Sequence, residues 1–208
     1  MSIDVKICGI NDVPGLKAAI DGGACYAGFV FFPSSRNFIT AETAQKLAAM
    51  VPPHIVKTGM FVDARDDEMR DIAGMVPLDL IQLHGKETPQ RVTEVKALTG
   101  LPVMMAIRIV TAAQFDNVPA YEAVADKILF DSRMGAESSG GPIDWPLLKT
   151  RTFKKPWLLA GGLTAQNLAD AVKASGAMAV DVSSGVEDTP GHKSPEKIRE
   201  FIGMAKQL

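Results

Sequence analysis

Ile3-Asp4-Val5-Lys6-Ile7-Cys8-Gly9 is the stretch of sequence that decides how this chain folds. It is a short run of β-forming residues that delivers a cysteine to its carboxyl end, where a glycine follows. Seven later stretches repeat the design of an apolar run that ends in a small, polar or charged residue: 27–32, 56–62, 78–84, 103–109, 127–131, 157–161 and 178–183. The eight runs begin 21 to 30 residues apart, which is the length of one strand followed by one helix.

The segments between these runs have the signals of helices. Asn11 or Asp12 can cap a helix that has Pro14 in its first turn, and Gly22-Gly23 can end it. Further helices are predicted at 41–50, after 63–68, at 89–98, 112–125 and 165–174, and from 194 onward. Eight alternating units with nearly continuous apolar strands predict a closed (β/α)8 barrel of eight parallel strands, in a single domain over residues 1–208. A doubly wound open sheet is the alternative.

Composition excludes several classes of partner. The net charge is −2 and the 22 basic residues are scattered, so the chain has no stripe that would attract nucleic acid or an anionic membrane. Cys8 and Cys25 lie in different segments, which fits a reducing compartment. The amino terminus lacks a signal-peptide pattern, and no apolar run approaches the ~18 residues of a membrane span. We expect a cytoplasmic protein.

A barrel gathers side chains that are far apart in sequence, because the carboxyl ends of all its strands meet at one mouth. Polar or reactive residues stand at or just beyond these ends in the predicted strands: Cys8, Arg36, Gln82, His84, Arg108, Asp131, Asp181 and Ser183. This set divides into a thiol, a carboxylate and a corner suited to an anion.

The anion corner is predicted from two turns, Gly161-Gly162 after the seventh strand and Ser183-Ser184-Gly185 after the eighth. Glycine allows backbone N–H groups to approach phosphate oxygens, and a helix that follows adds its positive partial charge. Either turn alone can be an ordinary tight connection. Two neighbouring turns of this kind predict a phosphorylated small molecule as the partner, because barrels often place a phosphate there.

Cys8 is the more specific candidate for a catalytic residue. Alternation along a strand puts Lys6 and Cys8 on one face, so the ammonium is expected to favour the thiolate. A thiol pKa somewhat below ~8.5 would make Cys8 a usable base near neutral pH. The alternative is a small buried hydrophobic residue, which is how we interpret Cys25.

Asp131 ends a buried strand, so its carboxylate must be paired, solvated at the mouth or functional. The alternative role is a cap for the loop at 132–142, the longest in the chain. His84 has no obvious orienting carboxylate near it in sequence, which favours a structural histidine over a base. No spacing typical of zinc ligands and no nucleotide-binding glycine loop is present, so neither a metal nor a cofactor is predicted.

Several motifs together resemble one enzyme family. They are Lys6-Ile7-Cys8-Gly9-Ile10, the Pro33-Ser34-Ser35-Arg36 ending of the second unit, Leu80-Ile81-Gln82-Leu83-His84-Gly85, Leu129-Phe130-Asp131-Ser132 and Asp181-Val182-Ser183-Ser184-Gly185-Val186-Glu187. In this order, and over nearly the whole chain, the sequence is similar to the phosphoribosylanthranilate isomerases, the barrel enzymes of tryptophan biosynthesis.

The resemblance implies roles for individual residues. Cys8 matches the general base and Asp131 the general acid of an Amadori rearrangement, and Arg36 matches the arginine that faces the anthranilate carboxylate. His84 and Asp181 are predicted as further substrate-binding residues. The positions expected to hold the phosphate are Gly161, Gly162, Ser184 and Gly185.

One departure from the family pattern is that Ser138 stands where the first glycine of a Gly-Ser/Thr-Gly run is expected. Two other functions stay open. A sugar-phosphate isomerase or epimerase of another pathway could share the phosphate corner, although histidine-pathway barrels offer two aspartates where this chain has Cys8 and Asp131. A non-catalytic phosphate-binding module would need neither residue. The sequence is compatible with a monomer or a homodimer.

Overall fold

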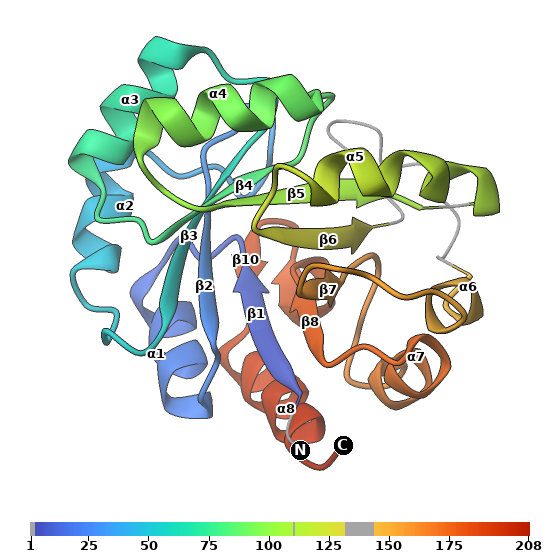
Figure 1. Ribbon diagram of the computed structural model, residues 1–208. Coiled ribbons are helices and arrows are strands. Elements are labelled where there is room, and N and C mark those ends of the chain that lie inside the picture. Colours follow the sequence, from blue (N-terminus) through green and yellow to red (C-terminus); the bar gives the residue numbers. More distant parts are fainter. Residues whose placement is uncertain (1–2, 110, 132–143) are drawn as a thin grey trace.

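The eight predicted strands form one closed barrel. The computed structural model describes residues 3–109, 111–131 and 144–208, and its barrel strands follow one another in chain order (Figure 1). They are β1 (Asp4–Cys8), β2 (Tyr26–Val30), β3 (Val56–Phe61), β4 (Leu80–Leu83), β5 (Val103–Arg108), β6 (Lys127–Asp131), β7 (Trp157–Leu159) and β8 (Ala179–Val182). Adjacent strands are parallel and β8 pairs with β1, so the (β/α)8 barrel is confirmed and the open sheet is wrong.

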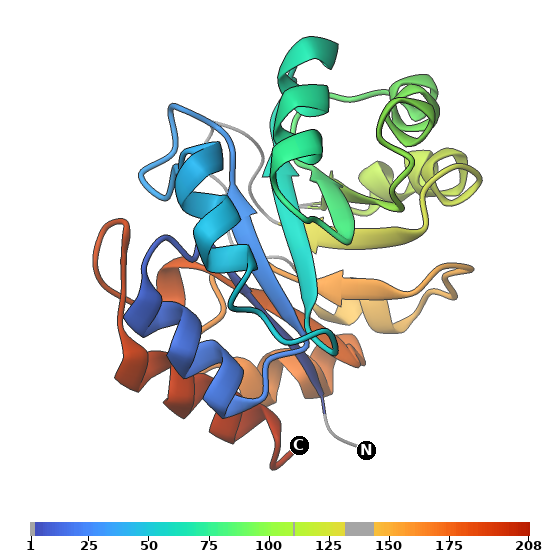
Figure 2. The same cartoon turned by 90° about the vertical axis from the view of Figure 1, so that its left-hand side faces the viewer.

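Helices surround the barrel on the outside (Figures 1 and 2). They are α1 (Val13–Gly22), α2 (Ala41–Ala48), α3 (Asp66–Met75), α4 (Pro89–Thr99), α5 (Val118–Glu122), α6 (Pro146–Lys149), α7 (Leu168–Ser175) and α8 (Pro195–Ala205). The cap of α1 is as predicted, because the Asp12 side chain accepts a hydrogen bond from the Gly15 amide at 2.7 Å. Gly23 ends that helix in the left-handed conformation, with φ of 85°.

Four parts of the chain differ from the predictions, and one of them is the short helix α6, which was not predicted. The helical segment predicted at 112–125, with an interruption at Pro119, is a 3₁₀ turn, η1 (Ala112–Asn117), followed by the short α5. α7 starts at Leu168 rather than at 165, because Thr164 and Asn167 first close a turn with reciprocal hydrogen bonds. A small hairpin that was not predicted, β9 (Glu187–Thr189) and β10 (His192–Lys193), follows the 3₁₀ turn η2 (Ser184–Val186).

The core has two parts. The larger cluster lies between the strands and the helices, and a smaller one fills the inside of the barrel with Tyr26, Leu80, Met104, Ala106, Leu129, Leu158 and Ala160. Because side chains alternate along each strand, the same inner face carries polar residues closer to the carboxyl ends, among them Cys8, Asp131 and Asp181. The apolar inner cluster therefore fills the barrel beneath the polar side chains at the carboxyl ends of the strands.

In the described part of the chain, none of the helices has the length and apolarity that crossing a membrane requires.

Candidate active site

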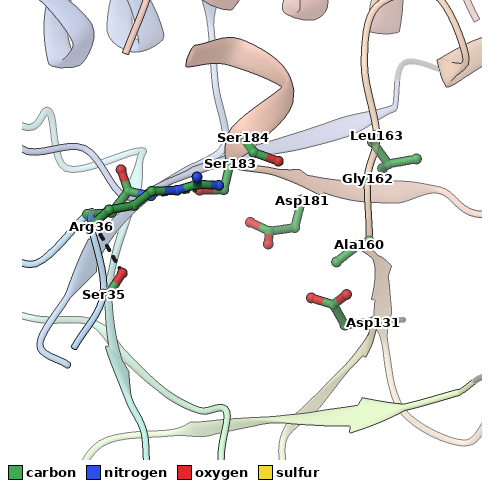
Figure 3. A pocket seen from close by; sticks show the side chains of 11 residues that line it. Ser35, Arg36, Asp131, Ala160, Gly162, Leu163, Asp181, Ser183 and Ser184 are labelled. Carbon is green, nitrogen blue, oxygen red and sulfur yellow. Dashed lines mark hydrogen bonds between the residues drawn. The ribbon is translucent and has the colours of Figure 1, made fainter. Parts of the chain in front are cut away.

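A cavity of about 210 Å³ opens at the carboxyl ends of the barrel strands (Figure 3). Its walls come from the loop after β2, from the end of β6 and from the turns after β7 and β8. They comprise Ser35, Arg36, Asn37, Asp131, Ala160, Gly161, Gly162, Leu163, Asp181, Ser183 and Ser184. Six of the nine predicted site residues are therefore brought together in one hollow: Arg36, Asp131, Gly161, Gly162, Asp181 and Ser184.

Asp181 connects the cavity wall to Cys8. The Lys6 ammonium, which is fully buried, donates to the Asp181 carboxylate at 2.8 Å across the β1–β8 pairing. Cys8 stands two residues further along β1 on the same face and is 5% exposed. A side chain at Gly28 would lie 3.1 Å from Lys6 Nζ and 3.4 Å from Cys8 Sγ, so the glycine leaves room for both groups.

Lys6 acts on the Cys8 thiol in the predicted direction, but the predicted net decrease of the thiol pKa is wrong. Burial raises the pKa of the Cys8 thiol above its ordinary value. Lys6 opposes this increase, but its ammonium is bound to Asp181, whose negative charge raises the thiol pKa further. Lys6 and Cys8 lie on one face of β1, as their alternation predicts, but the pairing of Lys6 with the Asp181 carboxylate from β8 was not predicted.

Asp131, at the end of β6, faces His84 from the end of β4. Asp131 Oδ2 lies 3.4 Å from His84 Nε2, and Gln82 Nε2 lies 2.9 Å from His84 Nδ1. With the Gln82 amide donating to Nδ1, the ring proton of a neutral His84 is on Nε2, directed at Asp131. The orienting carboxylate that seemed to be missing near His84 is therefore Asp131, 47 residues further along the chain.

The two glycine turns lie against each other. Gly161 and Gly162 both have positive φ, 91° and 72°, which favours glycine. A methyl group on Gly185 would overlap the carbonyl oxygen of Leu163, so the turn after β8 packs directly on the turn after β7. Ser184 lines the cavity from the start of η2, whereas Gly185 supports it from behind.

Arg36 reaches into the cavity from the loop after β2, and its guanidinium extends toward Ser183 in Figure 3. Its side chain is 51% exposed, which leaves it accessible to a ligand. The neighbouring Asn37, which was not predicted, also lines the cavity and binds Glu187 at the start of β9. The sequence does show a carboxylate, Glu187, close after the predicted turn at Ser184-Gly185. Its contact with Asn37 could not be predicted, because the two residues are 150 positions apart.

Three predicted site residues do not line this cavity: Cys8, His84 and Gly185. Cys8 is connected to the cavity by Lys6, which binds the cavity residue Asp181. His84 faces Asp131, and Gly185 packs on Leu163, and both of these partners line the cavity. The loop predicted at 132–142, with its departure at Ser138, lies outside the described residues. Within 3–109, 111–131 and 144–208, no group of three or more histidine, cysteine or carboxylate side chains is placed to hold a metal ion.

The closed barrel and the cavity at the carboxyl ends of its strands define a TIM-barrel enzyme. The family model described as N-(5′-phosphoribosyl)anthranilate (PRA) isomerase matches residues 5–204. The chain belongs to this family.

Relatives and solved structures agree with this assignment. The chain is 49% identical to N-(5′-phosphoribosyl)anthranilate isomerase of Paracoccus denitrificans, with 99% of this chain and 98% of the relative covered. It is 48% identical to the enzyme of Rhodospirillum centenum over the full length of both. The crystal structure of phosphoribosyl anthranilate isomerase from Thermotoga maritima superposes with a TM-score of 0.90 at 31% identity, covering 99% of this chain and 100% of that one.

Proposed function

We propose that this protein converts N-(5′-phosphoribosyl)anthranilate to 1-(2-carboxyphenylamino)-1-deoxyribulose 5-phosphate, the third step of tryptophan biosynthesis from chorismate. The observation that carries the proposal is the gathering of Asp131, Asp181, Arg36 and the two glycine turns in one cavity of a chain that belongs to this family. A related crystal structure, with a TM-score of 0.86 to this chain, holds the reduced form of that product.

Asp131 is the proposed general acid. Opening the ribose ring requires a proton on the ring oxygen as the bond from C1′ to that oxygen breaks, and a carboxylic acid at the cavity wall can supply it. His84 Nε2, 3.4 Å from Oδ2, is placed to fix the orientation of this carboxyl group. The ring-opened product is a Schiff base, which acidifies the hydrogen on C2′.

Cys8 is the proposed general base. As the thiolate it removes the C2′ hydrogen, and the resulting enolamine tautomerises to the ketose product. Lys6 favours the thiolate over the thiol, in opposition to burial and to Asp181. The acid on β6 and the base on β1 approach the sugar from different strands of one barrel, so each can act in its own step.

The two ends of the substrate carry its charges, and the site has a partner for each. We assign the phosphate to the turns at Gly161-Gly162 and Ser184-Gly185, and the anthranilate carboxylate to Arg36, with Asp181 and His84 as further substrate contacts. A guanidinium can bind a carboxylate through two parallel hydrogen bonds. Holding both ends converts binding energy into orientation of the reacting carbons.

Complementation tests this function. The gene should restore growth without tryptophan to a bacterial strain that lacks only this isomerase, and the purified protein should form the ketose product faster than the spontaneous reaction. A double variant with Cys8→Ala and Asp131→Ala is the matched control and should do neither. Failure of the wild-type chain in both assays would reject the proposal.

We further propose that residues 1–208 act as a single catalytic domain, in the cytoplasm, as a monomer or a homodimer. A related structure is described as that of monomers made from the dimeric enzyme of Thermotoga maritima. Sedimentation of the purified protein over a range of concentrations distinguishes the two states.

A further inference from the structure

A carboxylate outside the barrel is buried beside the loop that carries Arg36. Glu187 is the first residue of β9, and its side chain is 5% exposed. The mechanism proposed above assigns it no role. Both of its oxygens nevertheless have partners, and these partners come from the loop after β2 and from the hairpin.

The first oxygen, Oε1, binds two nitrogen atoms. Asn37 Nδ2 donates to it at 2.9 Å, and Lys193 Nζ donates to it at 2.9 Å from the paired position on β10. Asn37 is also confined from its other side, because a methyl group on Gly9 would lie 2.8 Å from Asn37 Cγ. The residue next to Arg36 is thus held between Glu187 and the turn that follows Cys8.

The second oxygen, Oε2, faces Arg36 itself. Arg36 Nε lies 3.7 Å from it, and the Gly191 amide donates to it at 3.1 Å. Gly191 also packs on the Arg36 backbone, since a methyl group there would lie 2.5 Å from the Arg36 carbonyl oxygen. Glu187 therefore acts on Arg36 directly through the ion pair, and indirectly through Asn37 and through Gly191, which packs on the Arg36 backbone. The ion pair engages the guanidinium at Nε, and the Arg36 side chain is still 51% exposed, so it stays accessible to a ligand.

Lys193 keeps this arrangement from cancelling the charge of Arg36. Its side chain is fully buried, and its ammonium donates to Glu187 and to the backbone and hydroxyl oxygens of Ser183, both at 3.1 Å. Burial alone would raise the pKa of Glu187, but the bonds from Lys193 and Asn37 outweigh burial and hold it below its ordinary value. The Lys193 ammonium offsets the Glu187 carboxylate, so Arg36 still presents a positive charge to the cavity.

We propose that Glu187 is a positioning residue for substrate binding, which orients the Arg36 guanidinium toward the carboxylate of the bound anthranilate. This inference rests on the proposed function and extends it to a residue that does not touch the substrate. The same carboxylate links the Arg36 loop to Ser183 through Lys193, so it sets the spacing between the two ends of the binding site.

Glu187→Gln tests the proposal, because it removes the charge and nearly keeps the shape. The Kd for the reduced product, 1-(o-carboxyphenylamino)-1-deoxyribulose 5-phosphate in its reduced form, should rise by roughly tenfold or more, and kcat should fall by less than threefold. Asp188→Asn is the matched control, since this neighbouring carboxylate is 61% exposed and contacts only Lys197 among the ion pairs described. It should change the Kd by less than twofold.

A double-mutant cycle separates positioning of Arg36 from a general loss of structure. In an Arg36→Ala background, Glu187→Gln should weaken binding by less than about twofold further, because the group that it orients is gone. Additive effects, or an unchanged Kd in the single variant, would overturn the proposal.

If Glu187→Gln fails to fold because Lys193 is left buried and unpaired, the pair Glu187→Gln with Lys193→Met removes both charges and takes its place in the cycle. A wild-type protein that neither binds the reduced product nor makes the ketose rejects the proposed function itself. Normal wild-type activity with no coupling between residues 36 and 187 rejects only this inference.

Discussion

Cys8 combines deep burial with a polar neighbourhood, and both affect its reactivity. Its thiol shares the inner face of β1 with Lys6, but the Lys6 ammonium is bound to Asp181. A residue of this kind has no packing role that a small apolar side chain could not fill. Its substitution should therefore separate catalysis from stability.

We expect Cys8→Ala to lower kcat by roughly 10²- to 10⁴-fold, because positioned proton transfer contributes that much to a rate. The midpoint of thermal unfolding should change little, since alanine fits the space of the thiol. Product formation followed by chromatography, corrected for spontaneous rearrangement, measures the effect. Turnover within threefold of the wild type would remove Cys8 from its role.

The pH dependence of the wild type should carry the signature of this thiol. Only the thiolate can act as the base, and its fraction grows as the pH rises through the thiol pKa. Because burial raises that pKa above its ordinary value, the thiolate absorbance at 240 nm that Cys8→Ala removes should still be increasing at pH 9 rather than level near neutrality. A plateau reached by pH 7 would contradict the direction of the shift.

We expect Asp131→Asn to lower kcat by roughly 10²- to 10⁴-fold as well, because the amide keeps the shape of the acid and cannot give up its proton. Gln82→Leu, which removes the partner of His84 Nδ1 without touching Asp131, is the graded comparison and should cost less. Near-normal kcat in the asparagine variant would exclude Asp131 as the acid.

For single residues, the sequence predicts the position in the barrel but not the partners. Cys8, Asp131 and Asp181 could be placed at the mouth, because strand parity and strand ends are local properties. The partners of these residues could not be predicted. Asp181 reaches Lys6 from 175 positions away, and Asp131 reaches His84 from the other side of β5. Burial raises the pKa of the Cys8 thiol, and the Asp181 carboxylate from a distant strand adds to that increase.

At the scale of elements, the contact between the turns after β7 and β8 is the feature that shapes the corner to which we assign the phosphate. We expect Gly185→Ala to lower the free energy of unfolding by about 1–3 kcal/mol, because its methyl group would overlap the Leu163 carbonyl. The affinity for inorganic phosphate should fall at the same time. Urea unfolding and competitive inhibition by phosphate measure the two effects.

Gly203→Ala is the control for this substitution. Gly203 lies within α8 and has open space around it, so alanine there should stabilise the protein by about 0.5–1 kcal/mol through helix propensity. If the two variants had equal stability, the close approach at Gly185 would not constrain the turn.

Strands and helices with regularly spaced apolar residues could be predicted, and short polar elements could not. The eight strands followed from apolar runs of regular spacing, and caps such as Asp12 marked the starts of helices. The β9–β10 hairpin was missed because its strands are only three and two residues long and mostly polar. Burial of Glu187 and Lys193 against the barrel holds it in place, and no local pattern reports that burial.

At the scale of the molecule, closure of the barrel depends on the pairing of its first and last strands. The Lys6–Asp181 ion pair crosses this seam in the interior. We expect Lys6→Met to lower the free energy of unfolding by about 3–5 kcal/mol, because it leaves the Asp181 carboxylate buried without its counter-charge. Chemical denaturation with circular dichroism measures the loss.

Lys57→Met is the matched variant for this measurement. Lys57 pairs with Asp79 at 2.6 Å, but Asp79 is 44% exposed, so its loss should cost at most about 1 kcal/mol. Equal losses in the two variants would show that burial at the seam adds nothing to the ion pair.

The apolar cluster inside the barrel has a consequence for how this enzyme can change. Leu80, Met104 and Leu129 pack inside the barrel and do not line the cavity, whereas polar residues nearer the carboxyl ends of the strands, such as Asp131 and Asp181, do. Residues that add stability through apolar packing can therefore be substituted without changing the cavity. Substitutions that raise the free energy of unfolding in this apolar cluster can compensate for destabilising substitutions in the cavity, which makes new activities easier to reach by design or by natural selection.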